Sequence, residues 1–223
     1  MYYLILVLPA MLFAMWANAK VNSTYREYSK VTTYSRMTGY EAARRILDAN
    51  GLRNVTIEHV RGELTDHYDP RTNVLRLSDG VFYSDSVSAI GVAAHESGHA
   101  VQYRQDYLPV KIRTAILPVC NFGSQAAWPI MMVGLVLGSM NLFRFGILLF
   151  SLIAVFQFVT LPVEFNASDR AMAALESSGA FTESELDGAQ NVLWAAGMTY
   201  VAALAVSLAN VMRLLLISNR RNR

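Results

Sequence analysis

The sequence predicts a mainly α-helical integral membrane protein, with about four transmembrane helices and one small α+β region. Two observations lead to this fold class. Hydrophobic residues make up 53% of the 223 residues, and they are bunched into runs long enough to cross a bilayer. The polar stretch between the first two runs instead alternates helical and strand-like patterns, and it contains the pentapeptide His95-Glu96-Ser97-Gly98-His99.

The apolar runs divide the chain into six segments. We expect a transmembrane anchor at 2–19, a metal-binding α+β domain at 20–114, transmembrane helices at 115–140 and 142–163, a helix and loop at 164–191, and a last transmembrane helix at 192–217. The first run lacks a basic segment before it, so we interpret it as an uncleaved anchor rather than a signal peptide. The single cysteine, Cys120, lies inside a predicted span, so no intrachain disulfide can form.

The charge distribution bears on partners and location. A net charge of +2 is too small to indicate a nucleic-acid partner, and the apolar runs make the lipid bilayer the expected surroundings. Basic residues cluster after the first run and before the second, which places the intervening domain in the cytoplasm by the positive-inside rule. Arg220, Arg221 and Arg223 argue the opposite, because four spans put the tail on the other side. Because of the basic residues that flank the domain, we expect a multi-pass cell-membrane protein with a cytoplasmic active site.

The pentapeptide is expected to lie on a helix. Small and apolar residues recur at three- and four-residue spacing from residue 84 to residue 102, and Ser84 or Ser86 suits the N-cap position. Gly91 and Gly98 each lower helix propensity by about 1 kcal/mol relative to alanine. We therefore expect another element to approach this helix closely at the glycines.

Helical spacing gives the pentapeptide its chemistry. His95 and His99 are four residues apart, so their imidazoles share one helix face and can bind one ion. Zn²⁺ accepts imidazole nitrogen and takes three protein ligands plus one open position in catalytic sites. Glu96 is placed to act on a water molecule at such an ion without binding the ion itself. The alternative is an amphipathic helix with two surface histidines.

The rest of the polar domain predicts a helix followed by strands. A helix is expected from Thr38 to Ala49, a β-prone stretch at 55–57, a turn at 69–73 and a strand at 74–78. A strand before the metal helix could pair its edge with an extended substrate backbone, or it could be an ordinary edge strand.

A third metal ligand is left open among several residues. His59 and His67 precede the pentapeptide, and several carboxylates follow it. Glu164 stands out because it ends a strongly apolar run, where a carboxylate is costly unless it is paired or binds a metal. Otherwise Glu164 simply marks the water edge of the span. A helix from Pro162 through Leu175 would direct Glu164 and Ser168 to one face.

Two stretches together carry a resemblance to a known family. The run from His95 to Gln102, followed by Leu161 to Ser168, resembles the bacterial membrane-bound neutral zinc metallopeptidases. Further similarity lies at Thr38-Gly39, at 49–52 and at 66–70, so the resemblance covers most of the chain. More distantly, the chain is similar to CAAX-prenyl and heat-shock-induced membrane proteases. Those proteins are gluzincins, in which two histidines and a downstream glutamate hold zinc.

The resemblance implies a zincin-like domain and a role for each residue. It makes His95, His99 and Glu164 the zinc ligands and Glu96 the general base, so the segment 164–191 would carry the third ligand. The distant relatives have an aspartate four residues after the ligand glutamate, whereas this chain has Ser168 with Asp169 beside it. The group that supports the first histidine is therefore open, and Asn166 is a further candidate. An oxyanion partner could be one of three residues: His67, Tyr68 or Tyr83.

The sequence thus predicts a membrane-bound zinc metalloendopeptidase that hydrolyses peptide bonds of membrane or membrane-proximal proteins. The main alternative is a catalytically inactive zinc-binding membrane chaperone or scaffold. Glu96 argues against it, because a structural zinc site usually has four protein ligands and no use for an adjacent base. A small transporter with a metal-sensing domain, and a hydrolase acting on another bond, are weaker alternatives.

Overall fold

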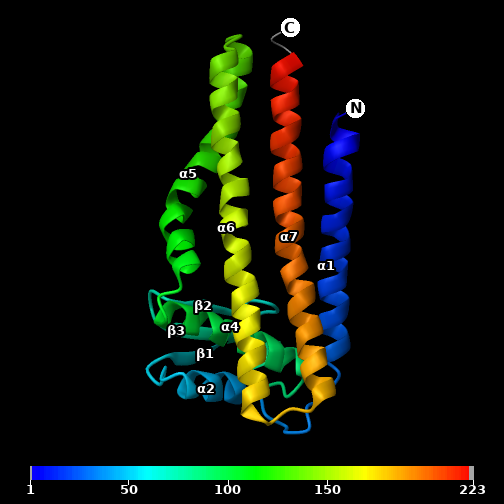
Figure 1. The fold of residues 1–223 in the computed structure, drawn as a ribbon, viewed down its shortest axis with the longest axis vertical. Coiled ribbons are helices and arrows are strands. Elements are labelled where there is room, and N and C mark those ends of the chain that lie inside the picture. The colour runs from blue at the N-terminus through cyan, green and yellow to red at the C-terminus, as the bar shows by residue number, and fades with distance from the viewer. Residues whose placement is uncertain (1, 221–223) are drawn as a thin grey trace. The chain divides into compact units, whose positions relative to one another are not determined.

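A computed structural model describes residues 2–220, and the side chain of Arg220 is not among its described parts. Arg221 and Arg223, on which the opposing charge argument depends, lie outside the described residues. The chain splits into two compact units. The first comprises Met1–Asn18, Leu108–Pro162 and Met198–Arg223, and the second comprises Ala19–Tyr107 and Val163–Gly197. The mainly helical fold with a small α+β part is confirmed (Figure 1).

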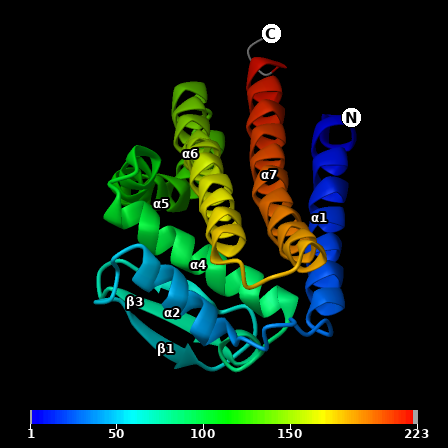
Figure 2. The ribbon, with the colours of Figure 1, turned by 60° about the horizontal axis from the view of Figure 1, so that its bottom comes forward.

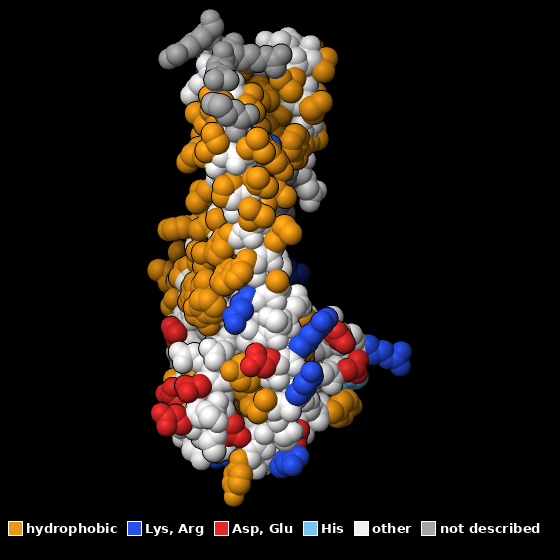
Figure 3. All heavy atoms as spheres, turned by 90° about the vertical axis from the view of Figure 1, so that its right-hand side faces the viewer, with side chains coloured by type: hydrophobic (Ala, Val, Ile, Leu, Met, Phe, Trp, Pro, Cys, Tyr) orange, Lys and Arg blue, Asp and Glu red, His pale blue; other side chains and the backbone are white. Residues whose placement is uncertain are grey.

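Among the described residues, four helices are long and apolar enough to cross a membrane, as predicted. They are α1 (Leu8–Tyr28, preceded by the π-helical turn η1, Tyr3–Val7), α5 (Leu108–Val136), α6 (Met140–Ser178) and α7 (Glu183–Arg220). Within the first unit, Met131 of α5 packs with Phe143 of α6 and Leu214 of α7. Figure 3 shows hydrophobic side chains gathered on the outside of these helices, where α1 exposes Leu12 and Met15. Such a surface suits lipid.

The second unit contains a three-stranded sheet in the order β1-β3-β2. The strands are β1 (Thr56–Val60), β2 (His67–Asp69) and β3 (Val74–Ser78). β3 pairs in parallel with β1 and antiparallel with β2, so it is the central strand. The expectation that β3 offers an edge to a substrate is therefore wrong, because both of its edges are occupied. The residues at 67–69 form the edge strand β2, although turn residues follow them directly.

Helices α2 (Gly39–Ala49) and α4 (Val87–Arg104) cover one face of this sheet, and the short α3 (Asp79–Phe82) precedes α4 (Figure 2). Leu47 of α2, Leu75 of β3 and Ala93 of α4 share one buried core. On its other side α4 packs against the C-terminal part of α6 and the N-terminal part of α7, in a second core. α4 is thus held between the sheet and these two helix ends.

Two helix starts match the sequence patterns. Thr38 caps α2 in a complete capping box with Glu41, and the Ser86 side chain caps α4, as one of the two expected serines. α6 differs from expectation, since it continues through Pro162 as one helix to Ser178. The expected segment boundaries at 163 and 191 stay predictions.

Candidate metal centre

Helix α4 places His95 and His99 on one face, with their rings 4.8 Å apart between centroids. Their spacing of four residues brings both side chains to the same side of the helix. The surrounding helix positions are small and buried, including Ala94 and Ala100. The helix therefore presents the imidazole pair as a fixed unit against α6.

Helix α6 brings Glu164 to the same place. Its Oε2 atom lies 3.4 Å from Nε2 of His95 and 3.5 Å from Nε2 of His99. Glu164 is buried, with 3% of the residue's surface exposed. The close approach of α6 depends on Gly98, where a Cβ atom would lie 2.6 Å from the backbone oxygen of Ala167. The expected close approach of another element at the glycines therefore leaves no room for a side chain at Gly98, whereas at Gly91 a Cβ atom would make ordinary contact, 3.6 Å from Ala189.

These three residues suit a zinc ion. Their candidate ligand atoms all lie within 4.8 Å of one another and form the one such group of His, Cys, Asp and Glu side chains found among residues 2–219. Two ligands of a tetrahedral zinc ion, each about 2.0–2.2 Å from the metal, lie about 3.3–3.6 Å apart. The two Nε2–Oε2 distances fall in this range. The donor set of two imidazoles and one carboxylate is also one that catalytic zinc sites use.

Nδ1 of each histidine, the ring nitrogen that does not face Glu164, lies within hydrogen-bonding distance of a neighbouring side chain. Nδ1 of His95 lies 3.2 Å from the Ser168 hydroxyl, and Nδ1 of His99 lies 3.0 Å from Oε1 of Gln102. Such contacts leave Nε2 of each ring directed to Glu164. Of the residues considered from the sequence, Ser168 is the one beside the first histidine. Asp169 is exposed, and Asn166 contacts Gln102 instead.

Glu96 lies one position after the first histidine and is held by the sheet. The backbone N–H of Tyr68 in β2 donates a hydrogen bond of 3.1 Å to its Oε2 atom. Burial raises the pKa of the Glu96 carboxyl, while the neighbouring His99 and His95 oppose this rise. The edge strand β2 therefore fixes the orientation of the carboxylate beside the three candidate ligands.

The charges around His99 favour a cation. Burial lowers the pKa of the His99 imidazole, but the hydrogen bond with Glu164 and the charges of Glu96 and Glu164 outweigh it, so the pKa is raised. Two carboxylates that face the same imidazole pair create a negative potential there. A divalent cation bound between these groups would neutralise it.

The three residues considered as oxyanion partners have different surroundings. The Tyr68 hydroxyl donates to Asn73, and the exposed Tyr83 packs its ring against His59. His67 lies on β2 with Nδ1 2.8 Å from the backbone oxygen of Thr65. Within the described part of the chain, the backbone N–H of Tyr68 is the group of these three residues that contacts Glu96. His67 is the first residue of strand β2.

Sequence reasoning missed two groups, the Gln102 side chain and the Tyr68 N–H. Gln102 is three residues after His99, which is a spacing that places it on the same helix face, so the helical pattern could have indicated it. The role of the Tyr68 N–H depends on β2 being an edge strand. The strand is only three residues long, and so short a sequence does not indicate where the strand lies in the sheet.

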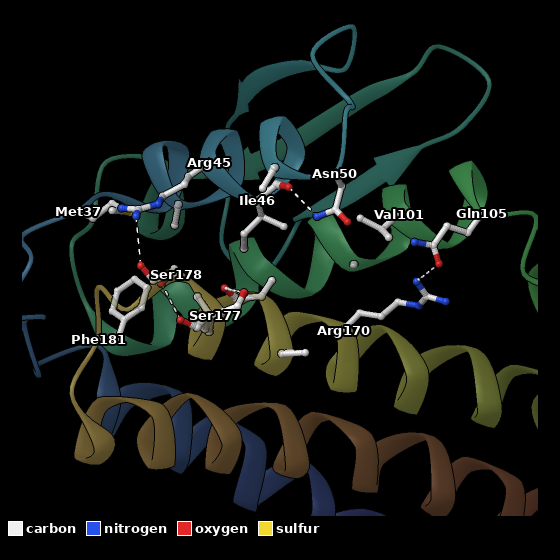
Figure 4. Close-up of a pocket in the computed structure, with 16 residues that line it drawn as sticks. Met37, Arg45, Ile46, Asn50, Val101, Gln105, Arg170, Ser177, Ser178 and Phe181 are labelled. Carbon is white, nitrogen blue, oxygen red and sulfur yellow. Dashed lines mark hydrogen bonds between the residues drawn. The ribbon is translucent and has the colours of Figure 1, made fainter.

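A cavity of about 550 Å³ lies beside the metal centre but does not contain it. It is lined by α2, α4 and α6, with Arg45 and Phe181 near one end and Arg170 with Gln105 near the other (Figure 4). Gly98 lines the cavity, whereas His95, His99 and Glu164 do not. The cavity and the candidate metal centre are therefore separate features of the second unit.

Comparison with known proteins identifies the family of this chain. A family model described as "Putative neutral zinc metallopeptidase" matches residues 3–219. A Bacillus subtilis (strain 168) protein described as "Putative membrane protease YugP" is 49% identical over 217 residues, which cover 97% of this chain and 96% of that protein. No solved structure matches the chain. The resemblance drawn from the residues is confirmed, and this chain belongs to the family of membrane neutral zinc metallopeptidases.

Proposed function

We propose that the protein is a membrane-bound zinc metalloendopeptidase of the gluzincin type. His95, His99 and Glu164 hold the zinc ion, and Glu96 of the H-E-x-x-H pentapeptide is the general base. The observation that carries the proposal is the placement of three ligand atoms at zinc-like separations, with Nε2 of both imidazoles directed to the same carboxylate oxygen.

When bound, zinc would polarise the substrate carbonyl and lower the pKa of a water molecule toward about 7. Glu96 takes the proton from that water as oxygen attacks the carbonyl carbon, and then delivers it to the leaving amine as the C–N bond breaks. The hydrogen bond from the Tyr68 N–H keeps one oxygen of Glu96 in place, which leaves the other for the water.

The edge strand β2 is the best candidate for binding the substrate backbone. The Tyr68 N–H points away from β3 to reach Glu96, so the outer edge of β2 faces the general base. In an antiparallel pair, a residue whose N–H points outward also directs its C=O outward. An extended substrate that pairs with this edge would pass the catalytic groups.

The substrates we propose are membrane proteins or segments next to the membrane. The helix that carries Glu164 also carries the most apolar window of the four candidate spans, in one continuous element. Proteins confined to the same bilayer would meet such a site more often than soluble chains. We further propose that the chain crosses the membrane several times with its active site on the cytoplasmic side.

The general-base role is tested with Glu96→Gln, compared with Glu63→Gln as a control in an exposed loop. The probe is fluorescently labelled casein, incubated with detergent-purified protein. We expect wild type and the control to cleave it, with loss after chelation and recovery with zinc. Glu96→Gln should keep zinc but cleave about 10²–10⁴-fold more slowly, since that is the usual contribution of an acid–base group. Cleavage by Glu96→Gln at the wild-type rate would contradict the role.

A further inference from the structure

A fully buried amide, that of Gln102, lies between α4 and α6 beside the metal centre. Its Oε1 atom lies 3.0 Å from Nδ1 of His99. Its Nε2 atom donates to the backbone oxygen of Val163 at 2.7 Å and to Oδ1 of Asn166 at 3.0 Å. An amide is costly to bury unless its polar atoms are bonded, and here both ends are.

The partners of Gln102 determine which way its amide points. A backbone carbonyl can only accept a hydrogen bond, so the NH₂ end of Gln102 must face Val163. Its oxygen then faces His99 and can only accept. Nδ1 of His99 must therefore carry the proton. In a neutral imidazole this leaves the lone pair on Nε2, which is the atom beside Glu164.

Arg170 fixes the same direction a second time. A guanidinium group has no acceptor, so its Nε, 2.7 Å from Asn166, requires the oxygen end of the Asn166 side chain. That oxygen also accepts from Gln102. Arg170 also donates to Oε1 of Gln105 at the same end of the cavity (Figure 4). Its guanidinium group lies over the ring of Tyr107. Arg170 and Gln102 thus both donate to one oxygen of Asn166, which requires the NH₂ end of Gln102 on this side.

The two histidines differ in whether their partner determines which ring nitrogen carries the proton. Ser168, the partner of His95, is a hydroxyl that can donate or accept, so it leaves the protonated nitrogen of His95 open. The Gln102 oxygen can only accept, so Nδ1 of His99 must carry a proton. Gln102 also bonds the backbone of Val163, directly before Glu164, so one amide sets the positions of two candidate ligands on different helices.

We propose that Gln102, oriented by Asn166 and Arg170, is a positioning residue that confines His99 to the form protonated at Nδ1 and aims its Nε2 lone pair at zinc. This inference rests on the proposed zinc site. It concerns the side chains behind that site, and it predicts an effect on the metal-free protein as well as on zinc binding.

The first test examines the wild-type chain. The detergent-purified chain is labelled with ¹⁵N-histidine and studied without metal at a pH about 3 units above the ordinary imidazole pKa. Ring ¹⁵N NMR signals of His99, assigned with His99→Gln, then report which nitrogen carries the proton. We expect Nδ1. A His99 ring without a proton on Nδ1 in the wild type would overturn the proposal, whether or not the chain binds zinc.

The second test measures zinc affinity by competition with a chelator. Gln102→Met keeps the length of the side chain but loses its polar atoms, and we expect its Kd to rise about 10–100-fold, as for other partners of metal-ligating histidines. Gln190→Met is the matched control, since Gln190 is an exposed glutamine on α7 outside this group of contacts. Its affinity should equal that of the wild type. Equal affinity in folded Gln102→Met would overturn the proposal.

A pair of substitutions at Asn166 decides the matter if Gln102→Met does not fold. Asn166→Asp keeps an acceptor for both Arg170 and Gln102, so we expect wild-type affinity and a His99 proton on Nδ1. Asn166→Leu removes the acceptor and should weaken zinc binding and release the constraint on His99. Equal zinc affinity and an equal His99 proton position in the two variants would contradict the role of Asn166 and Arg170 in orienting Gln102. Absence of zinc in the wild type would instead contradict the proposed function. The NMR result would still test whether Gln102 keeps the proton of His99 on Nδ1.

Discussion

At the scale of single residues, the metal centre depends on a glycine that lets two helices come close together. Gly98 lies between the two histidines and faces the backbone of Ala167 in α6. Gly91, two turns earlier on α4, faces Ala189 of α7 with more room, since a Cβ atom there would lie 3.6 Å from its nearest neighbours. The two glycines look alike in the sequence, but only Gly98 has a steric requirement.

We therefore predict opposite outcomes for alanine at these positions. Gly98→Ala should destabilise the protein by about 1–3 kcal/mol, as overpacking does. It should also reduce bound zinc, because α6 must move and carries Glu164 with it. Gly91→Ala should be neutral or stabilise α4 by up to about 1 kcal/mol. Thermal unfolding and zinc content of the two purified variants check this, and a zinc-replete, stable Gly98→Ala would contradict it.

At the scale of elements, α2 illustrates a helix whose start is determined locally. The backbone N–H and the hydroxyl of Thr38 donate to the Glu41 carboxylate, and the Glu41 N–H donates back to the hydroxyl. The backbone hydrogen bond from Thr38, followed by that of its hydroxyl, lowers the pKa of Glu41. A carboxyl whose pKa is lowered by folding stabilises the folded state only while it is ionised.

The capping box should therefore depend on pH. Glu41→Ala should lower the thermal midpoint at pH 7, by about 2–4 °C for each kcal/mol lost. The difference from wild type should be complete above the ordinary glutamate pKa of about 4.3. It should disappear as the pH falls through the lowered folded value, because wild-type Glu41 is then protonated. Thr38→Ser, which keeps the hydroxyl, serves as the control. A difference that stays constant with pH would contradict this explanation.

Elements specified by local signals could be predicted from the sequence, and those specified by distant pairing could not. The helix of His95 and His99, the cap at Ser86 and the start of α2 all follow from residues within one or two turns. The central place of β3 depends on its parallel pairing with β1, which no short pattern encodes. The three-residue spacing of Gln102 from His99 is a local signal, but its partners Val163 and Asn166 lie on a distant helix and could not be predicted.

At the scale of the whole molecule, each unit of the chain combines distant segments. α6 and α7 each contribute one part to the first unit and another to the second. The candidate ligands lie in the second unit, and Glu164 comes shortly after the α6 residues assigned to the first. Chain continuity through α6 is the basis on which the proposed substrates are membrane proteins.

The proposed topology predicts that the two ends of α5 lie on opposite sides of the membrane. In a Cys120→Ala background, Leu137→Cys should react with a membrane-impermeant maleimide on intact cells, whereas Glu63→Cys should react only after permeabilisation. Both positions are exposed, so burial does not prevent labelling. The reverse pattern would contradict a cytoplasmic active site, and labelling of both in intact cells would contradict a span between them.

The central claim is that His95, His99 and Glu164 bind one zinc ion, and the most direct test is zinc per chain by atomic spectroscopy. The detergent-purified wild type would be measured beside Glu164→Ala and beside Glu176→Ala, an exposed glutamate further along the same helix. We predict about one zinc in wild type and in Glu176→Ala, and much less in Glu164→Ala, because two imidazoles alone leave the site short of a third protein ligand. Equal zinc in all three proteins, or none in the wild type, would contradict the claim.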